Sequence, residues 1–373
     1  MFGNSWRLGR IAGVEVRIDT SWVVIALLVT YSLYLQFTEA FSLIRSGIAV
    51  LLAAFFALLF FGSVLAHEMA HALTARRRGI PVRGITLFMF GGATNAKVES
   101  RGPTDELVVS VVGPVTSLVL GGAFLLIGNV GGNVIARPLA GGLRYLGAVN
   151  LLLAIFNMLP GFPLDGGRVL RAIVWRITGS LSRATRVASI AGQIVGYLLV
   201  AVGVFFLTQD ALVSAIWLAA IGWFLAQAAR SSYEELQVRR MLESVDAEDL
   251  MSPNLLTVPA DLTLRDVVDG YFMRYDHGAF PVEDDGHTVG LVTLRGVKRV
   301  PQAEWASRRV RDTMEPIGEQ CSVAASARMD QVLSKIQEGG SGRCLVVRDG
   351  DVVGIITPSD IARWLQRRRT LTG

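Results

Sequence analysis

The stretch GIAVLLAAFFALLFFGSVLAHEMAHALTARRR, Gly47–Arg78, places a metal-binding pattern at the end of a long apolar run. About 20 apolar residues suffice for a helix to cross a bilayer, and two histidines beside a carboxylate are costly in such a helix. Positions i and i+4 share a helix face, so His67 and His71 can hold one metal ion between them. Glu68 directly follows the first histidine, where its carboxylate can reach a water at that metal. The alternative is a pair of structural histidines bonded to backbone carbonyls. Only four histidines occur in 373 residues, so an accidental match is rare.

The apolar residues are unevenly spread along the chain. Hydrophobic residues make up 51% of it, the mean hydropathy is +0.46, and all the long apolar runs fall within residues 1–230. This first part carries 18 Lys and Arg against 9 Asp and Glu, whereas the remainder carries 18 against 22. The excess of positive charge therefore belongs to loops beside a membrane, and neither part has the basic-aromatic pattern of a nucleic-acid surface. We expect a membrane half, a soluble half and no nucleic-acid partner.

Six segments are long and apolar enough to span a bilayer. They cover residues 20–37, 48–74, 105–128, 143–162, 188–207 and 210–229. With the N-terminus in the cytoplasm, 15 basic residues lie on that side of the membrane and 3 on the other. The positive-inside rule then predicts a multi-pass protein of the cell membrane. The N-terminus, the histidine end of the second span and the C-terminal half are all expected in the cytoplasm.

A short apolar segment, residues 85–90, lies between the second and third spans and is ended by Gly91 and Gly92. It is too short to cross the bilayer, so we expect a β-hairpin or a re-entrant loop embedded in the membrane and buried in protein. A free strand edge there can pair with an unwound substrate segment. A plain membrane-dipping loop fits the sequence equally well.

The third span has small residues at intervals of four, Gly113, Ser117 and Gly121. Small residues on one face let another helix approach closely. Generic helix packing and a direct role at the metal site are both compatible with this pattern.

A catalytic zinc ion usually takes three protein ligands and keeps one position for water, so a third ligand is required. Arg77 stands where the extended pattern would place a third histidine, six residues after His71. Asp165 lies in the segment NMLPGFPLDGG, residues 157–167, where two prolines interrupt an apolar span and two glycines follow the acid. Broken helices are tolerated at membrane depth where they line a cavity, so this carboxylate can turn inward. Asp165 is the predicted third ligand, and Glu99 is the second candidate.

These residues together resemble the site-2 protease family of intramembrane zinc metalloproteases, peptidase family M50. The resemblance covers residues 1–230 and rests on HExxH within a span and on N-x-x-P-x-x-P-L-D-G-G, which begins at Asn157. It implies that one Zn²⁺ ion is bound by His67, His71 and Asp165. It also implies that Glu68 activates water and that Asn157 positions the substrate or its oxyanion, unless this asparagine only caps or packs its helix. The segment Phe90–Ala93 is similar to the membrane-embedded hairpin of the family.

Residues 249–300 and 312–365 are two copies of one repeat. HTVGLVTLRGV, residues 287–297, aligns with DVVGIITPSDI, residues 351–361, and DLMSP in the first copy aligns with DTMEP in the second. The copies resemble tandem CBS domains, α/β modules that pair and often bind adenine nucleotides.

The second copy contains the complete CBS motif G-x-x-T-x-x-D, as Gly354, Thr357 and Asp360. The resemblance implies that ATP or another adenine nucleotide binds there, with the threonine at phosphate and the aspartate at ribose. The first copy keeps Thr293, but Gly296 stands at the position of the aspartate. A nucleotide sensor and a purely structural or dimerising pair are both compatible, and a homodimer through the CBS pair is a further expectation.

The sequence therefore predicts a polytopic α-helical membrane protein that acts as an intramembrane zinc endoprotease. Its parts are a protease domain, a helical linker and two CBS domains, at residues 1–230, 231–248, 249–300 and 312–365. We expect its substrates in the lipid bilayer to be single-span membrane proteins, such as an anti-sigma factor, a membrane-tethered regulator or a signal-peptide remnant. A CBS-gated metal or ion transporter and a catalytically silent scaffold are the alternatives.

Overall fold

The computed structural model divides the chain into two compact units, Met1–Glu234 and Glu235–Gly373, and each is described by itself. The described residues are 5–42, 44–88, 91–96, 102–131, 137–243, 245–253, 255–317, 322–339 and 342–372.

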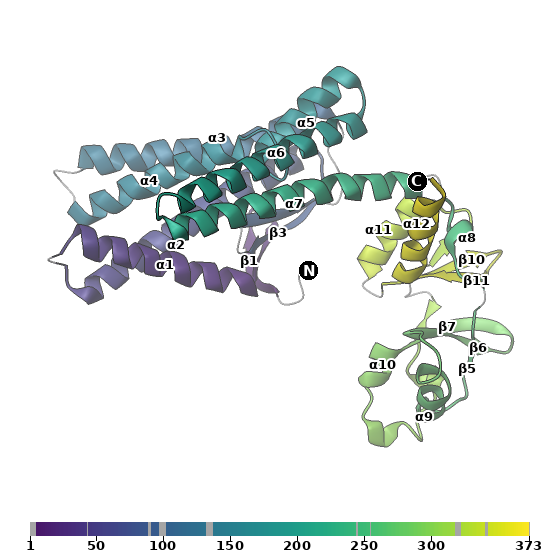
Figure 1. Cartoon of the computed structure of the whole chain (residues 1–373). Coiled ribbons are helices and arrows are strands. Elements are labelled where there is room, and N and C mark those ends of the chain that lie inside the picture. Colours follow the sequence, from purple (N-terminus) through teal and green to yellow (C-terminus); the bar gives the residue numbers. More distant parts are fainter. Residues whose placement is uncertain are drawn as a thin grey trace. The chain divides into compact units, whose positions relative to one another are not determined.

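Six helices among the described residues are long and apolar enough to cross a membrane. They are α1 (Thr20–Ala40), α2 (Ser46–Arg77), α3 (Pro103–Val130), α4 (Arg137–Asn157), α6 (Leu181–Leu207) and α7 (Leu212–Glu243) (Figure 1). Large apolar side chains such as Leu51, Leu118 and Val213 are exposed on them, as expected for helices whose solvent is lipid. The six predicted spans are confirmed as helices.

The segment after α4 departs from the predicted fourth span. The helix ends at Asn157, and the chain then turns through residues 158–164, because the two prolines there interrupt helical hydrogen bonding. A separate short helix, α5 (Asp165–Thr178), follows and ends at Gly179 in the left-handed conformation, with φ of 66°. The predicted broken span is therefore a helix, a turn and a second helix that begins at the acidic residue.

A four-stranded sheet accompanies the helices of the first unit, in the order β1 (Ser5–Ile11), β2 (Val14–Asp19), β3 (Val82–Phe88) and β4 (Gly91–Ala96). Strands β2 and β3 are parallel, with Val16 opposite Ile85, and the other two pairs are antiparallel. Met69 and Ala72 of α2 pack against the buried side chains of β2 and β3. The sheet therefore lies against the face of α2 next to the histidines.

The β-hairpin predicted near residues 85–92 is present as β3 and β4. Of the segment Phe90–Ala93, Phe90 lies outside the described residues, and the other three begin β4. The sequence predicts no strand before the first span, where the structure has β1 and β2.

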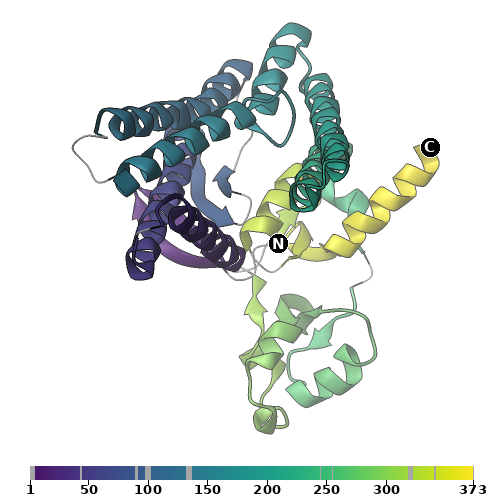
Figure 2. The same cartoon turned by 60° about the vertical axis from the view of Figure 1, so that its left-hand side comes forward.

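The second unit consists of two α/β lobes, each with its own sheet (Figure 1 and Figure 2). The first sheet contains β5 (Val258–Pro259), β6 (Ala279–Asp284), β7 (His287–Thr293) and β8 (Glu315–Pro316), and the second contains β9 (Ser322–Ala324), β10 (Cys344–Arg348) and β11 (Asp351–Ile356). The helices are α8 (Ala247–Leu250), α9 (Leu264–Val267), α10 (Leu294–Lys298), α11 (Met329–Gly339) and α12 (Pro358–Thr372). A small apolar cluster of Ala279, Leu291 and Leu345 joins the two lobes.

The two repeats exchange their first segments. Ser252, at the start of the first copy, bridges to Ile355 on β11 of the second copy. Reciprocally, β8, at the start of the second copy, pairs with β7 of the first. Each lobe is thus completed by chain from the other copy, so neither copy closes its sheet and core alone.

Candidate metal centre

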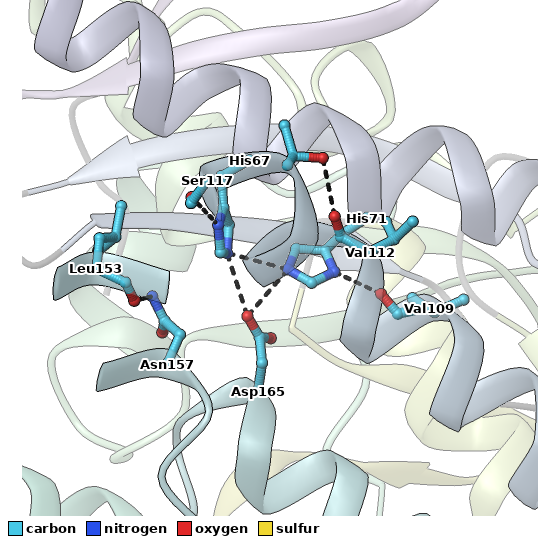
Figure 3. A network of polar contacts seen from close by, with 9 residues as sticks. His67, His71, Val109, Val112, Ser117, Leu153, Asn157 and Asp165 are labelled. Carbon is cyan, nitrogen blue, oxygen red and sulfur yellow. Dashed lines mark hydrogen bonds and ion pairs between the residues drawn. The ribbon is translucent and has the colours of Figure 1, made fainter. Parts of the chain in front are cut away.

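His67 and His71 lie one turn apart on α2, and each is only 5% exposed. Their Nε2 atoms are 3.2 Å apart. The carboxylate atom Oδ2 of Asp165, at the first residue of α5, lies 3.1 Å from both nitrogens (Figure 3). The structure therefore brings together the three side chains that the sequence singled out as metal ligands, across a separation of more than ninety residues.

The close packing of α5 on the preceding turn places Asp165 at this position. A side chain at position 167 would put its Cβ 2.2 Å from the backbone carbon of Gly161, so only glycine fits there. The glycines after the acid thus allow the helix to begin directly against the loop of residues 158–164.

The three donor atoms fit a zinc ion. Tetrahedral zinc with bonds of about 2.0–2.2 Å holds two ligand atoms roughly 3.3 Å apart. The separations of 3.1, 3.1 and 3.2 Å form a nearly equilateral triangle of this size, which corresponds to one face of the tetrahedron. Two imidazole nitrogens and one carboxylate oxygen are also a donor set that zinc accepts, with a fourth position left for water.

Helix α3 holds the outer nitrogen of each histidine. Nδ1 of His71 lies 2.6 Å from the carbonyl oxygen of Val109, and Nδ1 of His67 lies 2.9 Å from Oγ of Ser117. A carbonyl can only accept, so Nδ1 of His71 carries the proton and its Nε2 presents a lone pair to a metal. Ser117 can hold His67 in the same tautomer by accepting from Nδ1.

Gly113 allows α3 to lie this close to the histidines. A Cβ at this position would lie 2.1 Å from Nε2 of His71 and 2.7 Å from Nε2 of His67. Farther along the same face, Gly121 faces the backbone of Gly147 on α4, with its Cβ position 3.0 Å from the carbonyl oxygen. The small-residue face predicted on the third span therefore serves both helix packing and the metal site.

The charge of Asp165 also favours a cation. In the tautomer described above, both Nε2 atoms and Oδ2 of Asp165 are acceptors, so no hydrogen bond joins them and a shared cation satisfies all three. Glu99, the second candidate for a third ligand, lies outside the described residues.

Glu68 and Asn157 differ in how they relate to this cluster. Glu68 is half-buried on α2 directly after His67, and its carboxylate is near enough to interact electrostatically with the ring of His71. Asn157, at the end of α4, donates from Nδ2 to the carbonyl of Leu153 at 3.0 Å, a bond within its own helix (Figure 3). This bond is the helix-end role that the sequence kept as an alternative for Asn157.

The CBS motif of the second copy forms one compact polar group. Asp360 is 6% exposed, and its carboxylate accepts from the backbone N–H and hydroxyl of Thr357, from the hydroxyl of Ser252 and from Arg363. Burial raises the pKa of this carboxyl, and these bonds lower it further than burial raises it. Gly354 lies on the adjacent strand β11, with its Cβ position 2.4 Å from the sulfur of Met251.

Thr293 lies in the other lobe of the second unit. Its hydroxyl accepts from the backbone N–H of Gly296 at 3.0 Å and caps α10. In the first copy, therefore, the threonine bonds to the backbone of the residue that replaces the aspartate.

We expect the Ser117→Ala variant to bind zinc at least about tenfold more weakly than the wild type, because outer partners of ligating histidines typically contribute 10–100-fold to metal affinity. Competition with a chromogenic chelator measures this affinity. Ser110→Ala is the matched control, since Ser110 is buried on the same helix and its hydroxyl has no hydrogen-bond partner among the described residues. Equal zinc affinity of the two variants would contradict the role given to Ser117.

Comparison with known proteins agrees with this geometry. Residues 55–143 and 132–203 match Peptidase family M50, and residues 247–302 and 310–367 match the CBS domain. A relative from Synechocystis sp. is 35% identical over 97% of this chain and 96% of its own length. One from Mycobacterium tuberculosis is 36% identical over 96% of this chain and 92% of its own. Both carry the name "Putative zinc metalloprotease".

Two further matches come from Methanocaldococcus jannaschii. The protein named "Zinc metalloprotease MJ0392" is 29% identical over 96% of this chain and 95% of its own length. A solved structure titled "Site-2 Protease" is 24% identical and covers 62% of this chain and 95% of that chain, with a TM-score of 0.43. The resemblance identified in the sequence is confirmed by the family match and by the relatives of 35 and 36% identity, which extend over nearly the whole length. The chain belongs to peptidase family M50 and carries a pair of CBS domains after its membrane-spanning helices.

Proposed function

We propose that this protein is an intramembrane zinc metalloprotease that hydrolyses peptide bonds of membrane-spanning substrates. The observation that carries the proposal is the triangle of donor atoms from His67, His71 and Asp165, with Glu68 beside it on the same helix. The names of the relatives support a zinc metalloprotease, and the six apolar helices support a site within the membrane.

The residues of the chain divide the chemistry among them. When bound, zinc polarises the scissile carbonyl and makes water a stronger nucleophile at neutral pH. The carboxylate of Glu68 takes a proton from the attacking water and later delivers it to the leaving amide nitrogen. Val109 and Ser117 keep both histidines oriented throughout, since they hold the Nδ1 atoms. We propose that Asn157 releases Leu153 and donates to the developing oxyanion of the substrate.

The substrates that we propose are single-span membrane proteins, namely an anti-sigma factor, a membrane-tethered regulator or a signal-peptide remnant. The excess of arginine on one side of the membrane supports a site at the cytoplasmic end of α2. Strand β4 is the last strand of the order β1-β2-β3-β4, and we propose that the β3–β4 hairpin lies in the membrane and presents this edge to an unwound substrate segment.

A co-expression experiment tests the function. Candidate single-span proteins carrying a terminal tag are expressed with the wild type or with Glu68→Gln, and the uncleaved precursor is expected to accumulate only with the variant. In purified protein, removal of zinc by a chelator should stop cleavage of such a substrate, and added zinc should restore it. Cleavage that survives full metal removal would contradict a metalloprotease. The CBS-gated transporter is not favoured, because the matching family is a peptidase family and the relatives are named as zinc metalloproteases.

We also propose that the CBS pair binds an adenine nucleotide at Gly354, Thr357 and Asp360 and that binding alters proteolysis. The support is the complete motif, whose buried Asp360 carboxylate is held by a hydrogen bond from Thr357. ATP titrated into the full-length protein should bind the wild type. Asp360→Asn should weaken binding at least about tenfold, because the substitution removes the charged carboxylate that would accept hydrogen bonds from the ribose. Asp351→Asn, at a 75% exposed side chain, is the matched control. The sensor proposal fails if ATP neither binds nor changes the cleavage rate.

A homodimer formed through the CBS pair is proposed on the same family grounds. Light scattering of the detergent-solubilised chain measures the number of copies, and a monomer at all concentrations and nucleotide levels would contradict the dimer.

A further inference from the structure

A buried ion pair joins α3 to α5 beside the metal centre. Glu106 on α3 is 0% exposed, and the side chain of Arg171 on α5 is 13% exposed. Nε of Arg171 donates to Oε1 of Glu106 at 2.6 Å, and a second guanidinium nitrogen contacts the same oxygen. The other carboxylate oxygen, Oε2, is buried and has no hydrogen-bond partner in the described part of the chain.

The two ends of this pair lie on the helices that hold the metal ligands. Glu106 is one helical turn before Val109, the residue whose carbonyl accepts from His71, and two turns before Gly113 on the same face. Arg171 lies six residues after Asp165, on the helix that begins with this ligand. The ion pair therefore ties the helix that orients the histidines to the helix that carries the carboxylate ligand.

Arg171 also contacts the turn that leads into α5. Its guanidinium lies 5.0 Å from the centre of the Phe162 ring, within the range of a cation–π contact. Phe162 is itself buried, and its backbone N–H donates to the carbonyl of Ala188 on α6 at 3.1 Å. One side chain thus links α3, α5 and the turn of residues 158–164, which leads into Asp165.

Stability alone is a poor explanation for such a pair. Removing two charges from water is expensive, and apolar residues of similar volume in the same place often stabilise a protein equally well or better. The backbone of the two glycines after Asp165 packs directly against the turn of residues 158–164, and Arg171 bonds the same helix to α3. The position of the carboxylate therefore depends on this packing and also on the contact of Arg171 with Glu106 farther along the helix.

We infer that Glu106 and Arg171 are positioning residues of the metal centre, which hold Asp165 at the distance from the histidines that a zinc ion requires. The inference rests on the proposed zinc site. Its consequence is that the pair affects metal affinity and ligand geometry although neither residue is a metal ligand.

The test uses the full-length protein in detergent with Arg171→Met, with Glu106→Gln and with the double variant Glu106→Met/Arg171→Met. The double variant removes both charges together, so it leaves no unpaired buried charge and keeps the test valid if a single variant fails to fold. Arg176→Met is the matched control, since Arg176 also bonds from α5 to α3, through Thr104 at 3.2 Å, but is exposed. Zinc affinity is measured by chelator competition, and ligand geometry by the visible absorption spectrum of the cobalt-substituted protein.

We expect each folded variant of the pair to bind zinc at least about tenfold more weakly than the wild type and to show an altered cobalt spectrum, in the range seen for other supporting residues of metal sites. The control should match the wild type in both measurements. Wild-type affinity and an unchanged cobalt spectrum in the double variant would overturn the inference and leave the pair as a packing feature. Failure of the wild type itself to bind zinc would instead refute the proposed function, so the two failures are distinguishable.

Discussion

Replacing Glu68 with glutamine is expected to abolish proteolysis and to leave zinc bound. The ligand atoms belong to His67, His71 and Asp165, and the substitution keeps the size and shape of the neighbouring side chain while removing its basicity. General acid–base groups contribute about 10²–10⁴-fold to rate, and here one carboxylate serves both proton transfers, so we expect a loss of at least about 10²-fold. Cleavage of a tagged single-span substrate and zinc content by atomic absorption measure the two quantities in one preparation.

Glu39→Gln is the matched control for this experiment. Glu39 is exposed near the end of α1, and the same chemical change there should leave both cleavage and zinc unchanged. Undiminished cleavage by Glu68→Gln with zinc bound would remove Glu68 from the mechanism. Loss of zinc with cleavage intact would refute the zinc site itself.

Replacing Gly113 with alanine is expected to abolish zinc binding, whereas Glu68→Gln is expected to keep the zinc and lose the group that transfers the proton. The added methyl group would lie 2.1 Å from Nε2 of His71 and 2.7 Å from Nε2 of His67, so either the histidines or α3 must move. Movement of the histidines breaks the triangle of donor atoms, and movement of α3 removes the Val109 and Ser117 contacts that orient them. We therefore expect the purified variant to contain no stoichiometric zinc and to be inactive. Glycine to alanine normally favours a helix by about 1 kcal/mol, so a loss of function cannot be attributed to weaker helix formation.

Gly122→Ala is the control for the methyl group. Gly122 lies on the same helix α3, and a Cβ there meets nothing within 4 Å. This variant should bind zinc like the wild type. Wild-type zinc affinity in Gly113→Ala would show that α3 does not press against the histidines as described.

The parts of the site that the sequence could predict are those with residues that are energetically unfavourable within a membrane span. Histidines, an acid and prolines within apolar spans need a reason to be there, and they identified His67, His71 and Asp165 from sequence alone. The groups that orient the histidines could not be found in this way. Val109 contributes a backbone carbonyl, which every residue has. Ser117 is a serine, a residue type that is common in membrane helices at packing interfaces.

Arg171 shows a second limit of reading the sequence alone. The charge count that predicts topology treats each of the 15 basic residues assigned to the cytoplasmic side as a solvated charge. Arg171 is instead largely buried against Glu106, a partner 65 residues away that no local pattern indicates. One arginine among the 15 basic residues counted does not reverse the charge imbalance, so the predicted topology is unaffected.

The fold was predicted well for the long helices and less well for short strands. Six apolar runs are strong signals, whereas β1 and β2 are short and rich in arginine, and strand β2 completes its pairing only with β3 beyond two helices. The repeat in the second half showed that two copies exist. The spacing between the copies does not show that the first segment of each copy packs on the other copy. The sequence alignment is the same whether that segment packs on its own copy or on the other one.

The parallel pairing of β2 with β3 also determines when this part of the protein can be completed during synthesis. Strand β2 leaves the ribosome first, but its partner follows only after α1 and α2 have been made. The N-terminal hairpin must therefore wait, with one edge unpaired, while two helices enter the bilayer. A change that disturbs β1 or β2 would act on this late step of assembly, at the sheet that packs against the helix bearing the histidines.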